Sequence, residues 1–176
     1  MKDPNSKIYE GVEFSPGKGN PKFLNFWKGW SVSPVRGNVS KFKELIAALC
    51  DDDVACQDYL MDFLAHTIQK PETKPEVAIV MKGPQGIGKG TLMKLLGSFT
   101  QNYKHLSTTA SLVGNFSGHF LDAFIVFADE AVWGGDKTAE GRLKAMITEP
   151  TMSIRAMNKD EIYVKSYIRL FVASNE

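Results

Sequence analysis

Short apolar runs in the second half of the chain predict the strands of a buried sheet. Residues 77–81 and 124–128 are continuous apolar runs of strand length, which is typical of strands covered on both faces. Residues 167–173 predict a third strand, and residues 103–107 a short fourth one. Because helical patterns separate these runs, we expect an α/β fold with a parallel sheet flanked by helices.

Helical patterns precede and separate the predicted strands. From residue 40 onward, apolar side chains recur at the i, i+3, i+4, i+7 spacing of one buried helix face. Aspartates at 51–53 end this helix and offer an N-cap to a second helix over 54–70, which Pro71 stops. Further helices are expected over 91–99, 109–116 and 136–148. The positions predicted to be buried in the first three long helices are Phe42, Leu45, Ile46, Leu49, Leu60, Phe63, Leu64, Ile68, Leu92, Leu95 and Leu96.

The pattern divides the chain into three parts. Residues 1–38 read as an irregular, aromatic-rich segment, residues 39–75 as a helical region, and residues 76–176 as the α/β core. Within the first part, the aromatic stretch 23–30 is expected to dock on the main body as a pad, with a base-stacking surface as the alternative. In the core, residues 152–157 and 162–165 predict an antiparallel hairpin.

Composition narrows the class of protein without naming a function. The chain has 176 residues, is 43% hydrophobic and 23% charged, and carries a formal net charge of +1. These values are typical of a globular domain and give no nucleic-acid footprint by themselves. No apolar run is long enough for a membrane span, no signal peptide is visible, and the two cysteines lack zinc-ligand spacing. We therefore expect a cytoplasmic protein with reduced thiols and no membrane partner.

A glycine-rich loop with a lysine follows the first predicted core strand. Glycines let the backbone curl so that several N–H groups point at one anion, and the helix that follows adds partial positive charge. The loop departs from the common G-x-x-x-x-G-K-[ST] pattern, because its hydroxyl comes one place late, at Thr91. We expect Thr91 to take the magnesium side. The loop residues are Gly83, Pro84, Gln85, Gly86, Ile87, Gly88, Lys89, Gly90 and Thr91.

Two further predicted strands end in polar residues that suit a phosphate site. Asp129 and Glu130 follow the strand at 124–128, at the carboxyl end where α/β sheets place ligands. Asp129 suits the coordination shell of Mg²⁺, and Glu130 suits the polarisation of an attacking water. Asn175 follows the last strand and is expected to contact phosphate or water. With Lys89, these three residues form the predicted catalytic set.

The loop, the stretch Val126–Glu130 and the stretch Phe171–Asn175 together resemble the superfamily 3 helicase domain of phage, plasmid and viral primase-helicases. The resemblance covers roughly residues 20–176. It implies an AAA-like P-loop NTPase core, ATP and Mg²⁺ as cofactors, and a hexameric ring acting on single-stranded or forked DNA. It also implies that Lys159, at the turn of the predicted hairpin, contacts the DNA backbone.

Members of this helicase family continue beyond the strand that ends this chain, and they carry an arginine finger there. We therefore expect the core to be truncated at its C-terminal end and the chain to be part of a longer protein. Two alternatives stay open. The loop also resembles that of nucleoside monophosphate kinases, which would need AMP for turnover. A nucleotide-binding DNA or assembly module without turnover is the other.

Overall fold

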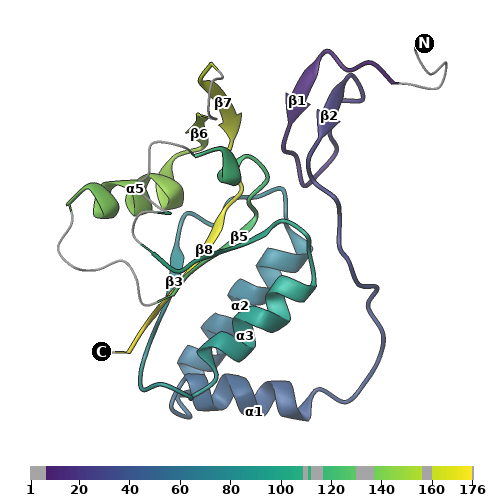
Figure 1. The fold of residues 1–176 in the computed structure, drawn as a ribbon. Coiled ribbons are helices and arrows are strands. Elements are labelled where there is room, and N and C mark those ends of the chain that lie inside the picture. Colours follow the sequence, from purple (N-terminus) through teal and green to yellow (C-terminus); the bar gives the residue numbers. More distant parts are fainter. Residues whose placement is uncertain (1–6, 109–110, 112–116, 130–136, 156–159, 176) are drawn as a thin grey trace.

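A four-stranded parallel sheet forms the centre of the molecule (Figure 1). The computed structural model describes residues 7–108, 111, 117–129, 137–155 and 160–175. The prediction of an α/β fold with a helix-flanked parallel sheet is confirmed. The strands, in their order across the sheet, are β3 (Ala78–Lys82), β8 (Arg169–Ser174), β5 (Ile125–Asp129) and β4 (Tyr103–Leu106).

Each face of the sheet carries its own hydrophobic core. Successive side chains of a strand point to opposite faces, so Ile125 and Phe127 of β5 enter one core while Val126 and Ala128 enter the other. Three helices cover the first face: α1 (Ser40–Leu49), α2 (Val54–Gln69) and α3 (Lys89–Ser98). The second face is covered by the 3₁₀ turn η1 (Gly118–Phe120), α5 (Lys137–Thr148) and the antiparallel hairpin of β6 (Thr151–Ile154) and β7 (Ile162–Lys165).

Local sequence signals set several of the element ends. The Asp53 carboxylate accepts a hydrogen bond of 2.8 Å from the Cys56 amide, which caps α2 as predicted. The hairpin is also confirmed, with Ser153 opposite Tyr163 in its register. None of the helices among the described residues is long and apolar enough to cross a bilayer.

The N-terminal segment packs on the sheet through its aromatic side chains. Trp27 lies 4.9 Å from the buried Phe124 ring, centroid to centroid, and meets Trp30 edge-on at 5.3 Å. The predicted docking of this pad is confirmed, and packing occupies both indoles. The segment also holds two short strands that the sequence did not predict, β1 (Gly11–Glu13) and β2 (Phe23–Asn25), which pair in parallel. The three-part division of the chain stays a prediction.

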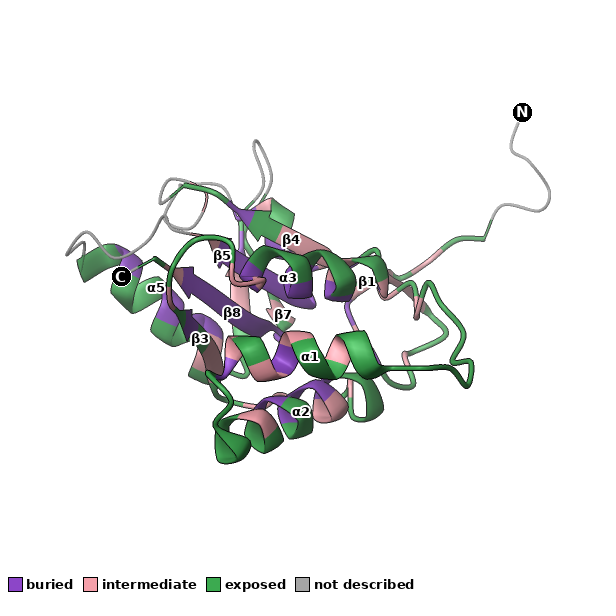
Figure 2. Ribbon diagram, turned by 90° about the horizontal axis from the view of Figure 1, so that it is seen from below, coloured by how far each residue is buried: buried purple, intermediate pink, exposed green. Residues whose placement is uncertain are grey.

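Some burial predictions were wrong, and strand order explains the first of them. Residues 77–81 were expected to be covered on both faces, but β3 lies at the edge of the sheet (Figure 2). Its Val80 is 55% exposed. An edge strand has a neighbouring strand on one side only, so its side chains can be exposed even where the sequence is apolar. An apolar run alone does not show whether a strand lies at the edge. Ile68 and Leu95 were also expected inside but are 41% and 37% exposed. Both line an apolar groove of about 380 Å³ between α1, α2 and α3. Of the short helix predicted at 109–116, only residue 111 is described.

A buried arginine ties the connection between α2 and β3 to the sheet. Arg169, at the start of β8, has no exposed surface and lies 4.3 Å over the Phe124 ring. Its guanidinium donates to the carbonyls of Lys70 (2.8 Å), Thr73 (2.6 Å) and Tyr167 (2.5 Å). Burial lowers the pKa of Arg169 to about 10, with Glu72 acting in the opposite direction. The residue therefore remains a cation at neutral pH.

Candidate phosphate site

The described residues of the predicted site meet at one edge of the sheet. Parallel strands end at the same edge, and β3, β8 and β5 are neighbours there: Lys82 pairs with Ser174, and Ala173 pairs with Asp129. The loop 83–91 leaves β3 at this edge, and Asn175 follows β8. Strand order thus gathers segments that lie far apart in the sequence.

The loop has the backbone of an anion-binding turn. Gly83, Gly86 and Gly88 adopt positive φ angles of 147°, 92° and 111°, which L side chains rarely adopt. Gly88 is the N-cap of α3, so the positive end of that helix points toward the loop. The first amides of an α-helix have no acceptor within the helix, and in α3 they lie directly after the loop. Amides at such a position suit an anion.

Lys89 connects the start of the loop to the residue that follows β8. Its ammonium donates to the carbonyls of Gly83 (2.5 Å) and Pro84 (3.1 Å) and to Asn175 Oδ1 (3.1 Å). The residue is only 8% exposed, so these bonds replace water around a largely buried charge. The structure thus brings Lys89 and Asn175, which are far apart in the sequence, into direct contact.

The remaining loop residues present mostly exposed groups. Pro84, Gln85, Gly86, Gly90 and Thr91 are exposed, whereas Ile87 is half-buried. The Thr91 hydroxyl stands in the first turn of α3, and the half-exposed Asp129 carboxylate stands at the end of β5. Glu130 and Lys159, two of the predicted site residues, lie outside the described residues.

The oxygen ligands at this edge fit Mg²⁺ better than a transition metal. Hard cations prefer carboxylate and hydroxyl oxygens, and Mg²⁺ is commonly held by one or two carboxylates together with substrate phosphates and water. Within the described part of the chain, no three His, Cys, Asp or Glu side chains group as a metal site.

One polar neighbour of the site, His105, was not predicted from the sequence. This residue lies on β4, and its Nε2 is 3.5 Å from Asp129 Oδ2. The Asp129 carboxylate also acts on Tyr103: burial, and then this charge, raises the pKa of Tyr103 to about 12. No spacing in the sequence signals these contacts, because they depend on the pairing of β4 with β5.

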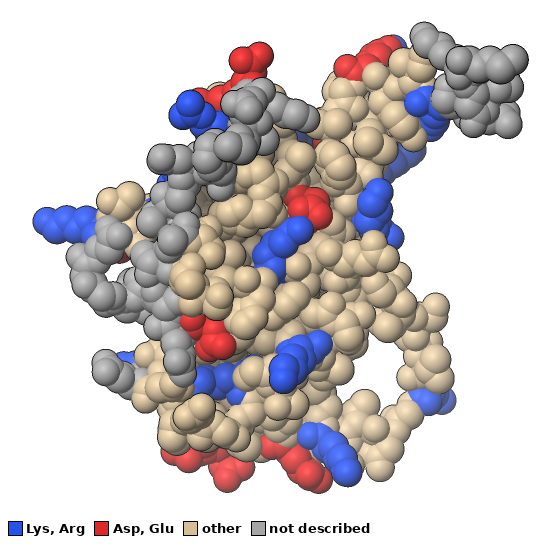
Figure 3. Space-filling model, in the orientation of Figure 1, with Lys and Arg blue, Asp and Glu red and all other residues tan. Residues whose placement is uncertain are grey.

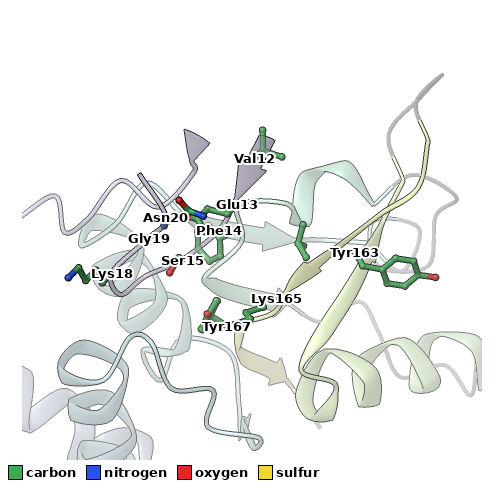
Figure 4. A pocket seen from close by; sticks show the side chains of 11 residues that line it. Val12, Glu13, Phe14, Ser15, Lys18, Gly19, Asn20, Tyr163, Lys165 and Tyr167 are labelled. Atoms are coloured by element: carbon green, nitrogen blue, oxygen red, sulfur yellow. Dashed lines mark hydrogen bonds between the residues drawn. The ribbon is translucent and has the colours of Figure 1, made fainter. Parts of the chain in front are cut away.

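A separate cavity of about 490 Å³ lies between the N-terminal segment and β7 (Figure 4). It shares no residue with the loop. Lys18 and Lys165 are among its lining residues, but the Tyr163 side chain points away from the N-terminal segment. On the face shown in Figure 3, basic and acidic side chains are interspersed, without a continuous basic patch. Neither feature displaces the loop edge as the candidate site.

Comparison with known proteins identifies the family. A family model described as DUF5906, a family of unknown function, matches residues 81–176, more than half of the chain. The chain belongs to the DUF5906 family. The matched region begins in β3 and includes the loop, β5, the hairpin and β8, so it contains the whole candidate site.

The relatives of this DUF5906 chain include a phage DNA primase-polymerase. The chain is 30% identical over 162 residues to a DNA primase-polymerase of Nitratiruptor phage NrS-1, with 88% of this chain and 22% of the relative covered. An apo structure of the NrS-1 C-terminal region matches with a TM-score of 0.82 and 28% identity, covering 96% of this chain and 43% of that one. A second, the A form, also gives 0.82, with 27% identity and coverage of 99% and 45%. The chain thus spans about a fifth of the curated relative's length and less than half of each solved chain.

These relatives correct the predicted function. The chain was predicted to be an ATP-hydrolysing DNA helicase of superfamily 3, and that prediction is wrong, because the related protein is described as a DNA primase-polymerase. The same finding overturns the monophosphate kinase alternative and the P-loop ATPase description that accompanied the resemblance. The hexameric ring rested on that resemblance alone. The predicted context of phage DNA replication is consistent with these relatives, and the relative is an enzyme.

Proposed function

We propose that this chain is part of a DNA replication enzyme of the phage primase-polymerase type, and that its loop 83–91 binds the phosphates of a nucleoside triphosphate. The observation that carries the proposal is the loop itself. Three glycines at positive φ precede a helix N-terminus, whose first amides have no acceptor within the helix. DNA synthesis consumes nucleoside triphosphates, so such a site suits the context of the relatives.

Each group at the sheet edge has a role in this proposal. Lys89 supplies positive charge to the terminal phosphates, exchanging its bonds to the Gly83 and Pro84 carbonyls for bonds to phosphate oxygens. Asn175 holds the ammonium in place from the end of β8. Thr91 and Asp129 hold Mg²⁺, which neutralises phosphate charge when it is bound. Glu130, next to Asp129 in the sequence, stays a predicted catalytic residue of this edge.

DNA is the proposed macromolecular partner. The support is that the relative is described as a DNA primase-polymerase, together with the hairpin of β6 and β7, between whose strands Lys159 stands in the sequence. A lysine between two strands is suited to contact a phosphate backbone as a point charge. Binding assays with single-stranded DNA and with forked DNA distinguish between these two partners.

Binding of ATP to the Lys89→Ala variant tests the triphosphate proposal. A charge-assisted hydrogen bond to phosphate contributes about 1.5–3 kcal/mol, so the affinity for Mg-ATP should fall at least about tenfold. Calorimetric titration of the full chain with ATP in the presence of Mg²⁺ measures this directly. Lys94→Ala is the matched control, because Lys94 is an exposed lysine on the same helix and should leave affinity unchanged.

The competing explanation is that Lys89 only fastens the loop to β8. In that case Lys89→Ala lowers the melting temperature, because three hydrogen bonds are lost, while the wild-type chain binds no ATP. Unimpaired ATP binding by Lys89→Ala would also contradict the proposal. Circular dichroism of the variant separates a loss of affinity from a loss of folding.

A further inference from the structure

His105 and Asp129 are brought together by the pairing of β4 with β5. His105 lies directly opposite Phe127 in this parallel register, and Asp129 is two residues further along the same strand. Residues two apart share a face of the sheet, so all three side chains lie on the face that α3 covers. This is the face on which the phosphate loop leads into α3.

Two contacts fix the His105 ring. The imidazole stacks on Phe127, with ring centroids 5.1 Å apart and an interplanar angle of 20°. Its Nε2 points to Asp129 Oδ2 at 3.5 Å. The two side chains are 47% and 42% exposed, so a ligand arriving from solvent can reach the carboxylate. The stack sets the plane of the ring, and the nitrogen engages one of the two carboxylate oxygens.

We propose that His105 is a positioning residue that orients the Asp129 carboxylate for the Mg²⁺ held with the triphosphate. This inference rests on the proposed function. Its Nε2 lies against Oδ2, so Oδ1 is the carboxylate oxygen that would be left for the metal. A carboxylate that is free to rotate must be ordered when the ion binds, whereas a carboxylate held by a neighbour is ordered beforehand. Loss of such a supporting contact around a metal ligand typically weakens metal binding about 10–100-fold.

Two substitutions separate the polar contact with Asp129 from the stack on Phe127. His105→Phe keeps an aromatic ring on Phe127 and removes the donor. His105→Gln places an amide N–H near the position of Nε2 and removes the ring. Positioning predicts that His105→Phe is impaired in Mg²⁺ binding and that His105→Gln is largely rescued. If His105 only packs on Phe127, Mg²⁺ binding should instead be impaired in His105→Gln and retained in His105→Phe.

In a first experiment, MgCl₂ is titrated into the full chain with a fluorescent ATP analogue, and fluorescence is measured. In a second, MnCl₂ is titrated into the full chain with ATP, and free Mn²⁺ is measured by electron paramagnetic resonance. For His105→Phe, the metal concentration at half-saturation should rise at least about tenfold. For His105→Gln it should stay near the wild-type value. Affinity for ATP in excess chelator should be unchanged in both variants. His119→Phe is the control, because His119 lies in η1, contacts the Ser111 carbonyl and should behave as wild type.

Wild-type metal affinity in His105→Phe, or impairment confined to His105→Gln, would overturn the inference and leave the triphosphate site standing. A wild-type chain that binds no ATP with or without metal would overturn the proposed function and this inference with it. Melting temperatures confirm that each variant is folded.

Discussion

At the scale of single residues, two largely buried cations serve different ends. Lys89 lies at the edge of the sheet, and in the proposed complex phosphate oxygens replace its bonds to the Gly83 and Pro84 carbonyls while its bond to Asn175 stays. Arg169 sits deep inside, and its bonds hold the backbone between α2 and β3 against β8. A buried charge is retained only where hydrogen bonds offset its desolvation, so Arg169 should matter for stability and not for binding.

Replacing Arg169 tests this structural role. Arg169→Met removes the donors of three carbonyls, and leaving buried acceptors unpaired costs about 1–3 kcal/mol for each group. We expect the free energy of unfolding to fall by at least about 2 kcal/mol in urea denaturation. The free energy of unfolding of Arg169→Lys, whose ammonium is a single charged centre, should lie between those of Arg169→Met and the wild type. A Met variant as stable as wild type would mean that the desolvation cost of the arginine already cancels its hydrogen bonds.

At the scale of elements, the strand–loop–helix unit from β3 to α3 depends on where its glycines stand. Gly88, the N-cap of α3, has a φ of 111°, and a Cβ there would lie 2.4 Å from Leu45 Cδ1 of α1. Gly90 follows two residues later without a positive φ, and a Cβ added there would meet no atom within 4 Å. The same residue type is therefore required at one position and replaceable at the other.

These two glycines should respond to alanine with opposite signs. Gly88→Ala should lower the free energy of unfolding by about 1–2 kcal/mol, because a left-handed φ is strained for an L residue. Gly90→Ala should raise it by up to about 1 kcal/mol, because alanine loses less backbone entropy in a helix. Chemical denaturation of both variants checks the pair. Equal effects at both sites would contradict the backbone account of the loop.

At the scale of the whole molecule, aromatic packing joins the N-terminal segment to the core. Trp27 meets Phe14, Trp30 and Phe124, and Phe14 in turn meets Tyr167 just before β8. The Asn102 amide adds polar contacts by donating to the Phe26 carbonyl (3.1 Å) and the Asp122 carbonyl (2.9 Å). The segment therefore contributes to the hydrophobic core on the sheet face that α1, α2 and α3 cover.

Truncating the central indole should loosen this whole segment. Trp27→Ala removes a large packed ring, which costs about 3 kcal/mol in unfolding free energy. We also expect faster proteolytic cleavage within residues 31–39, since their anchor on the core is weakened. Limited proteolysis and urea denaturation measure the two effects. Val35→Ala is the control, because Val35 is 88% exposed and its truncation should change neither. Unchanged cleavage in Trp27→Ala would show that other contacts hold the segment.

Much of the fold could be predicted from residue patterns, and the errors share a cause. The α/β class, the helices α1, α2, α3 and α5, the capping aspartate and the hairpin follow from periodicity and turn chemistry, which are local. The exposure of Val80, Ile68 and Leu95 was missed because it depends on which element lies next to each side chain. The pairing of β1 with β2 was missed for the same reason.

The function shows where a resemblance misleads. Motifs at three strand ends were enough to predict a phosphate site, because glycine, lysine and carboxylate have the same chemistry in any fold. They were not enough to choose the helicase family, which the phage primase-polymerase relative overturned. A site recurs on proteins with different activities, so motif chemistry constrains the ligand class more tightly than the reaction.

The sequence by itself determined the loop, its lysine and the residues that follow each strand, because local chemistry fixes turns, caps and strand ends. Only the tertiary structure decided that β8 lies between β3 and β5, which places Asn175 on Lys89. It alone decided that β4 pairs with β5, which sets His105 against Asp129. Strand order and register arise from the packing of the entire chain, and no short stretch of sequence encodes them.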